Sequence, residues 1–179
     1  DEETFGLGVK LGDNANAEPE CVYRFASSRT VRNKLTGPDA PAFSYLFGDC
    51  LAVTYIYRDD LHVIQGVMVN AWMDELCPAS ERVDPEKYFF RLTAQAGKAR
   101  RRFPKIATAR GIGVGSAASE VKAAYGEPDA VNEAGWYAYE EGNFRLIFAL
   151  FDGRVVMSTL MSTLGTPKVQ RTIARCGSG

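Results

Sequence analysis

The chain has 179 residues, of which 46% are apolar and 24% charged, and its formal net charge at pH 7 is −1. These values are typical of a soluble globular protein with one domain or two small ones, and they exclude a general electrostatic attraction to nucleic acid or anionic membranes. No apolar run approaches the roughly 20 residues that a membrane-spanning helix needs, so we predict no membrane span.

The beginning of the chain and its cysteines predict a compartment. The sequence starts with DEETFG in place of a methionine, which indicates either a mature protein whose signal peptide has been removed or a shortened chain. Four widely spaced cysteines, Cys21, Cys50, Cys77 and Cys176, favour two disulfides in the periplasm or outside the cell. The preferred pairing is Cys21–Cys50 with Cys77–Cys176, and four unpaired thiols in a cytosolic protein are the alternative. The chain has no C-x-x-C and only one histidine, His62, so we predict neither a metal site nor a cofactor.

Residues 1–73 are predicted to form a first unit built around a β-hairpin. The apolar runs 50–57 and 61–69 flank Arg58-Asp59-Asp60. This connection is too short for a parallel crossover, so the two strands must be antiparallel.

Residues 74–109 are predicted to form a helical connection. Asp84 can cap a helix with Pro85 at its first position, and Pro104 ends it. The basic run 98–102 (KARRR) lies in the last turns, where cations match the negative end of the helix dipole. The apolar residues fall on one helical face, which should pack onto one or both units: Tyr88, Phe89, Leu92, Ala96, Ala99 and Phe103.

Residues 110–165 are predicted to form a second unit, and residues 166–179 a C-terminal tail. Ser116 is the predicted N-cap of a short helix, which Gly126 and Pro128 end. Three strands follow at 135–139, 144–151 and 154–161. Asp152-Gly153, between the last two, is a strong signal for a hairpin turn.

Similarity between the halves suggests a repeat. TVRNKLTGPDA (30–40) aligns with EVKAAYGEPDA (120–130), which makes it the first unit's helix candidate. Residues 40–60 align without a gap on residues 134–154. The predicted fold class is therefore α+β, with two tandem helix-plus-antiparallel-sheet units joined by an amphipathic helix.

The order of elements in the second unit resembles the repeat of the β-lactamase-inhibitor proteins and of the small lipoprotein of the outer-membrane β-barrel assembly machinery. The resemblance implies a tandem fold and a binding role, without a target. The residues that carry it are Val121, Gly126, Pro128, Trp136, Tyr137, Phe148, Asp152, Gly153 and Val155.

The candidates for chemistry are weak. Residues 111–115 read G-x-G-x-G with no lysine after them, and so lack the pattern of a phosphate loop. No base is adjacent to Cys77 in the sequence, and Glu140 and Glu141 would point to opposite faces of a strand. We therefore predict no catalytic residue. Two alternatives stay open: a cleft between the units that brings His62, Asp59, Asp60 and Cys77 together, and a nucleic-acid or anionic-lipid surface along 98–110.

The predicted function rests on the strands. In 144–151 both faces are largely apolar, so helices on one side leave a second apolar face that another element, a second copy of the chain or a partner must cover. We predict a secreted or periplasmic, non-enzymatic protein-binding module, such as an inhibitor or an envelope interaction factor. A homodimer and a small-ligand-binding protein or enzyme are the alternatives. The predicted partner-binding residues are the aromatic side chains typical of interfaces: Phe43, Tyr45, Trp72, Trp136, Tyr137 and Tyr139.

Overall fold

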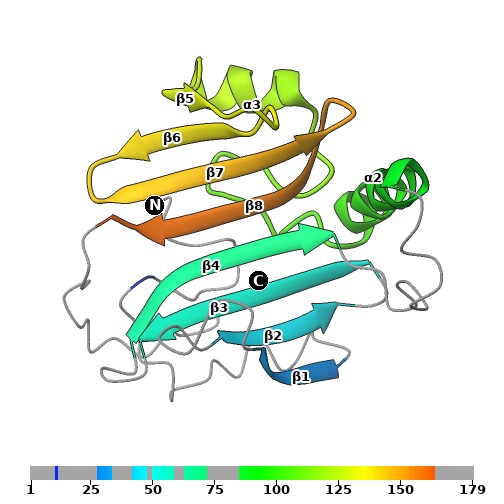
Figure 1. Cartoon of the computed structure of the whole chain (residues 1–179), viewed down its shortest axis with the longest axis vertical. Coiled ribbons are helices and arrows are strands. Elements are labelled where there is room, and N and C mark those ends of the chain that lie inside the picture. The colour runs from blue at the N-terminus through cyan, green and yellow to red at the C-terminus, as the bar shows by residue number, and fades with distance from the viewer. Residues whose placement is uncertain are drawn as a thin grey trace.

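One continuous antiparallel sheet dominates the structure. The computed structural model describes Leu11 and residues 28–33, 42–47, 50–58, 63–71 and 85–163. These residues form a sheet of eight strands in the order β1-β2-β3-β4-β8-β7-β6-β5, and two helices (Figure 1). The strands are β1 (Ser28–Asn33), β2 (Ala42–Phe47), β3 (Leu51–Arg58), β4 (Val63–Ala71), β5 (Ala130–Val131), β6 (Tyr137–Glu141), β7 (Phe144–Phe151) and β8 (Arg154–Ser162). The helices are α2 (Pro85–Arg102) and α3 (Ala118–Tyr125).

The predicted division into two helix-plus-sheet units is wrong. β4 pairs directly with β8 along Gly66↔Met161 to Asn70↔Met157, so the strands before and after α2 share one sheet. The first unit's helix candidate, 30–40, begins inside a strand, because β1 pairs with β2 through Arg29↔Tyr45. Residues 30–33 of that candidate are therefore strand, and residues 34–40 lie outside the described residues; the described chain is mostly sheet.

The sheet is symmetrical in its strand order about the β4–β8 pair. β1 to β4 form one meander and β5 to β8 another, and each meander runs in chain order from an outer edge of the sheet to this seam. The turns differ by one residue, because Phe47↔Leu51 closes the β2–β3 turn whereas Glu141↔Phe144 closes the β6–β7 turn. The gapless alignment of 40–60 with 134–154 therefore slips by one residue at this turn.

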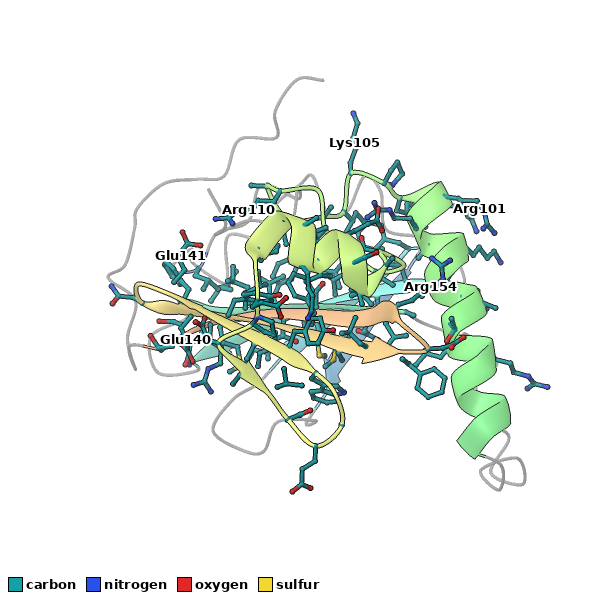
Figure 2. All side chains as sticks on the ribbon, turned by 90° about the horizontal axis from the view of Figure 1, so that it is seen from above. Arg101, Lys105, Arg110, Glu140, Glu141 and Arg154 are labelled. Atoms are coloured by element: carbon teal, nitrogen blue, oxygen red, sulfur yellow. The ribbon has the colours of Figure 1, made fainter. Side chains whose placement is uncertain are left out.

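The helix predicted within residues 74–109 is confirmed, although residues 74–84, with the predicted cap Asp84, lie outside the described residues. α2 begins at Pro85 and ends at Arg102, in the basic last turn. Figure 2, which views the sheet along its edge, shows α2 standing across the ends of the strands. Ala96 and Ala99 are fully buried in the core, and Leu92 packs against it. The ring of Phe103, just after the helix, meets that of Phe47 with their centroids 5.8 Å apart.

α3 lies on one face of the sheet, at its β6–β7 end (Figures 1 and 2). Val121 is fully buried beneath it, and the ring of Tyr125 lies 5.5 Å from that of Phe148 on β7. The hydrophobic core lies on this side, with Val53 and Val69 from the central strands. These side chains belong to the apolar set on one side of the pleat, since side chains alternate along a strand.

The start of α3 differs from the prediction by one residue. Ala117, not Ser116, is the N-cap. The backbone N–H of Ala117 donates a hydrogen bond to the carboxylate of Glu120 at 2.6 Å. The hydroxyl of Ser116 is buried and accepts a bond from the backbone N–H of Gly113 at 3.1 Å. Gly126 ends the helix as predicted, with a φ of +82°.

The β7–β8 hairpin is confirmed. Asp152 and Gly153 have φ angles of +48° and +67°, which is the left-handed conformation that a two-residue hairpin turn requires. β7 has the predicted bounds and β8 ends one residue later, whereas β6 is displaced from the predicted 135–139 to 137–141.

Candidate functional site

The glycines at 113 and 115 let the loop pack closely against α2 and against the segment that follows it. A Cβ atom at Gly115 would lie 2.4 Å from the carbonyl oxygen of Ala96 and 2.7 Å from the Cβ of Arg100. A Cβ at Gly113 would lie 2.7 Å from the carbonyl oxygen of Ile106. Only glycine permits such close approaches of the backbone, so these residues have an architectural role.

Much of the basic segment 98–110 is bound within the molecule. Arg100 donates to the carbonyl oxygen of Gly111 at 3.1 Å and to the hydroxyl of Ser116, and pairs with Glu120 at 3.3 Å. These bonds hold the glycine loop and the start of α3 against α2.

Arg110 is bound in the same way. Its guanidinium lies 4.7 Å from the ring centroid of Tyr125, donates to the carbonyl oxygen of Ala124 and pairs with Glu141 at 3.7 Å. With Arg100 and Arg110 engaged, the segment offers fewer cations to phosphates than its sequence suggested. The side chains of Arg101 and Lys105 remain exposed (Figure 2).

A cavity of about 630 Å³ opens beside Arg110. Tyr125, Leu146 and Leu160 contribute to its apolar lining, and Glu141 adds a charge. Because both charged groups of the lining pair with each other, the cavity presents no single strong charge to a ligand.

Tyr139, one of the predicted partner-binding residues, has contacts within the fold, and its role toward a partner stays a prediction. Its side chain is only 7% exposed, and its hydroxyl donates to the carbonyl oxygen of Gly126 at 3.1 Å. The ring packs against Tyr125 and Phe148. Burial, with a smaller contribution from nearby Tyr137, raises the pKa of Tyr139 to about 12. Contact with a partner would require this packing to open.

The other predicted partner-binding residues differ in position. Tyr137 is half-buried, with the ammonium of Lys122 5.6 Å from its ring centroid. Trp136 is 37% exposed at the start of β6. Phe43 and Tyr45 are on β2, but their side chains and all of Trp72 lie outside the described residues.

The disulfide pairing stays a prediction, and the cleft with His62, Asp59, Asp60 and Cys77 stays an alternative. Cys50 is buried at the start of β3. Cys21, Cys77 and Cys176 lie outside the described residues, as do His62, Asp59 and Asp60. Among the residues that the structure does describe, no group of three or more His, Cys, Asp or Glu side chains could hold a metal. No described helix is both long and apolar enough to cross a bilayer.

The sheet face opposite α3 is a second apolar surface. The registers place Met68 beside Thr159 and then Ile147, in a row that crosses β4, β8 and β7. Met161 of the next row is 39% exposed, and Met157 is half-buried. The residues of what we call the methionine face are Ile56, Met68, Ile147, Met157 and Met161.

Sequence reasoning missed the methionine face. It identified two apolar faces and chose the aromatic residues, yet this face carries three methionines, of which Met161 is exposed and Met68 and Met157 are half-buried. The signal was present as the alternate positions of 154–161, where Met157 and Met161 lie opposite the buried Ser158 and Leu160.

Comparisons with protein-family models, with curated proteins and with solved structures each found no match to this chain. The likeness to the β-lactamase-inhibitor repeat therefore stays a prediction from the sequence, and a function for this chain has to be inferred from its own residues.

Proposed function

We propose that this chain is a non-enzymatic protein-binding module of the periplasm or the extracellular space, and that the methionine face contacts the partner. The observation that carries the proposal is the exposed side chain of Met161, with half-buried Met68 and Met157 nearby, on the side of the sheet opposite α3; Thr159, between them in the β4–β8 seam, is buried. Exposed apolar area of this kind is typical of interaction surfaces.

The methionine face is continuous across strands. At Gly66, where there is no side chain, a Cβ atom would lie 3.5 Å from Cγ of Met161 and 3.6 Å from Cδ1 of Ile56. These two side chains therefore reach over the glycine from either side. Methionine has a flexible, polarizable side chain that adapts to the shape of a partner.

A polar boundary limits the methionine face on one side. Arg145 lies between Met161 and Glu140 in the register, and its Nε donates to Oε1 of Glu140 at 2.5 Å. An apolar centre with charged groups at its margin is the usual composition of a protein interface. Trp136 lies two residues before Ala138, which pairs with Ile147, so alternation places it toward this face.

The test is retention of a partner from an envelope extract by the immobilised full chain. Met161→Lys places a charge at the exposed methionine of the methionine face, next to Arg145, and Trp136→Ala removes an exposed aromatic residue at its margin. We expect Met161→Lys to abolish retention, because an unpaired charge would be buried on binding. Trp136→Ala should weaken it.

Val131→Lys is the matched control. Val131 is 55% exposed and pairs with Tyr137, so it lies on the α3 side of the sheet. The control should retain the partner as the unchanged chain does. Equal losses in Val131→Lys and Met161→Lys, or retention by Met161→Lys, would contradict the proposal. If the retained protein is the chain itself, the face is a homodimer interface and the proposed partner is wrong.

A further inference from the structure

A second cavity lies between α2 and the β7–β8 turn, at the ends of the strands. Its volume is about 540 Å³. Helix and turn contribute to its lining, which consists of Thr93, Ala94, Gly97, Arg100, Arg101, Gly115, Asp152 and Arg154. This cavity is distinct from the methionine face, and a ligand bound in it would be independent of the proposed function.

Three guanidinium groups line this cavity, against the single carboxylate of Asp152. Arg100 is paired with Glu120. Within the described part of the chain, neither Arg101 nor Arg154 forms an ion pair with a carboxylate. Two positive charges without ionic partners thus border the same space, with one negative charge close by.

A hydrogen bond holds the guanidinium of Arg154 in place, and that of Arg101 lies beside a glycine. Arg154 donates to the carbonyl oxygen of Gly115 at 3.2 Å, which uses one N–H group and leaves its other donors. Gly97 has no side chain, and a Cβ there would lie 3.8 Å from Nη1 of Arg101. The guanidinium of Arg101 therefore lies near the glycine surface of α2, beside the open volume.

Guanidinium groups that border the same cavity repel one another, and an anion bound in the cavity reduces that cost. The planar fork of N–H donors in arginine matches the oxygens of a phosphate, and two such groups suit its double charge. A phosphate group has the volume of only a few water molecules, at about 30 Å³ each, so the cavity has room for more than the phosphate. Thr93 and Ala94 line the remaining space with a weakly polar surface.

We propose that this cavity binds the phosphate group of a small phosphate monoester, with Arg101 and Arg154 as the two ligand-binding cations. Its organic part would lie along Thr93 and Ala94. Asp152 opposes the anion and limits the affinity.

Isothermal titration calorimetry on the full chain tests the proposal with three probes: phenyl phosphate, inorganic phosphate and benzoate. Phenyl phosphate should bind most tightly, inorganic phosphate more weakly because it leaves the rest of the cavity empty, and benzoate weakest because it has one charge. Arg154→Met and Arg101→Met should each weaken phenyl phosphate binding about tenfold or more, as expected for a charged hydrogen-bonded contact.

Two further variants sharpen the test. Asp152→Asn should strengthen binding severalfold, because it removes the opposing charge, and asparagine tolerates the left-handed turn. Lys105→Met removes an exposed cation outside the cavity lining (Figure 2), and should change the affinity less than twofold. Gly97→Ala adds a methyl group to the lining on a helix that alanine favours, so weaker binding by this variant would support the site without loss of the fold.

Several results would overturn the proposal. One is the absence of binding heat with both phosphate probes, and another is benzoate binding as tight as that of phenyl phosphate. A third is an equal loss of affinity for phenyl phosphate in Lys105→Met and Arg154→Met. The last would indicate a diffuse attraction to positive charge. Weaker binding by Asp152→Asn would also contradict the assigned role of this carboxylate.

Discussion

Gly115 is the position at which a single methyl group should have the greatest effect on the packing of α2. We expect Gly115→Ala to destabilise the fold through two separate contributions. Its φ of +92° is a conformation that costs a residue with a Cβ roughly 1–2 kcal/mol. The new Cβ would also lie 2.4 Å from the carbonyl oxygen of Ala96 and 2.7 Å from the Cβ of Arg100.

The overlap cannot be relieved by turning a flexible side chain, because the atoms belong to the backbone of α2 and to the first carbon of Arg100. Overpacking of this kind typically costs about 1–3 kcal/mol. The two contributions together give a destabilisation of about 3 kcal/mol. With an m-value of about 2 kcal/mol/M, that corresponds to a decrease of about 1.5 M in the urea midpoint.

Gly111→Ala provides the control in the same loop. Its φ is +77°, and a Cβ there would meet no atom within 4 Å. It should show only the conformational cost, about 1–2 kcal/mol. Equilibrium unfolding in urea, followed by tryptophan fluorescence, compares the two variants. If Gly115→Ala were no less stable than Gly111→Ala, the close approach of the loop to α2 would not be the reason for glycine at 115.

Three other side chains give predictions of their own. Ser158 is fully buried in the core and, within the described part of the chain, its hydroxyl has no hydrogen-bond partner. Ser158→Ala should therefore leave the urea midpoint unchanged or raise the stability by up to about 1 kcal/mol. A loss of stability of more than about 1 kcal/mol would reveal an unrecognised hydrogen bond. Because burial raises the pKa of Tyr139 to about 12, above its ordinary value of about 10, the folded protein holds this phenol proton more tightly than the unfolded chain does. The resulting stabilisation is complete below about pH 10 and is lost as the pH rises through about 12, so Tyr139→Phe should show a smaller fall in stability over that range; an unchanged pH dependence would contradict the assignment. Asp129 accepts a hydrogen bond from the backbone N–H of Glu140 at 2.7 Å, on the outer side of β6; Asp129→Ala should speed amide hydrogen exchange at Glu140 while the exchange of central strand amides stays the same.

Local signals in the sequence predicted the elements that depend on neighbouring residues. Pro85 marks the start of α2, Gly126 ends α3, and Asp152-Gly153 turns β7 into β8. Each of these positions is governed by backbone conformation, which a residue largely determines by itself. The prediction was wrong where distant residues decide. Residues 30–33 lie in β1 because their backbone groups pair with those of β2, and no neighbouring residue in the sequence indicates that pairing.

The candidate sites show the same division. The sequence indicated that both faces of β7 are apolar, but it could not show that Tyr139 is closed off by α3 while Met161 remains exposed. Ser116 was misassigned as a cap because its hydroxyl is used by Gly113 and by Arg100, sixteen residues earlier. The cavity beside α2 brings together Arg101 and Arg154, which are far apart along the chain and carry no shared motif.

The β4–β8 seam has a consequence for how the protein is made. β8, the strand that pairs with β4 across the seam, follows β4 by about ninety residues in the chain. During synthesis this edge of β4 therefore has no partner until α2 and most of the second meander have emerged. Contacts this distant in sequence form late and slowly. In the interval, β8 of a neighbouring chain presents the same complementary edge, and a sheet completed that way would be a domain-swapped dimer. At high concentrations of newly made chain, the seam is therefore where correct folding competes with exchange between molecules.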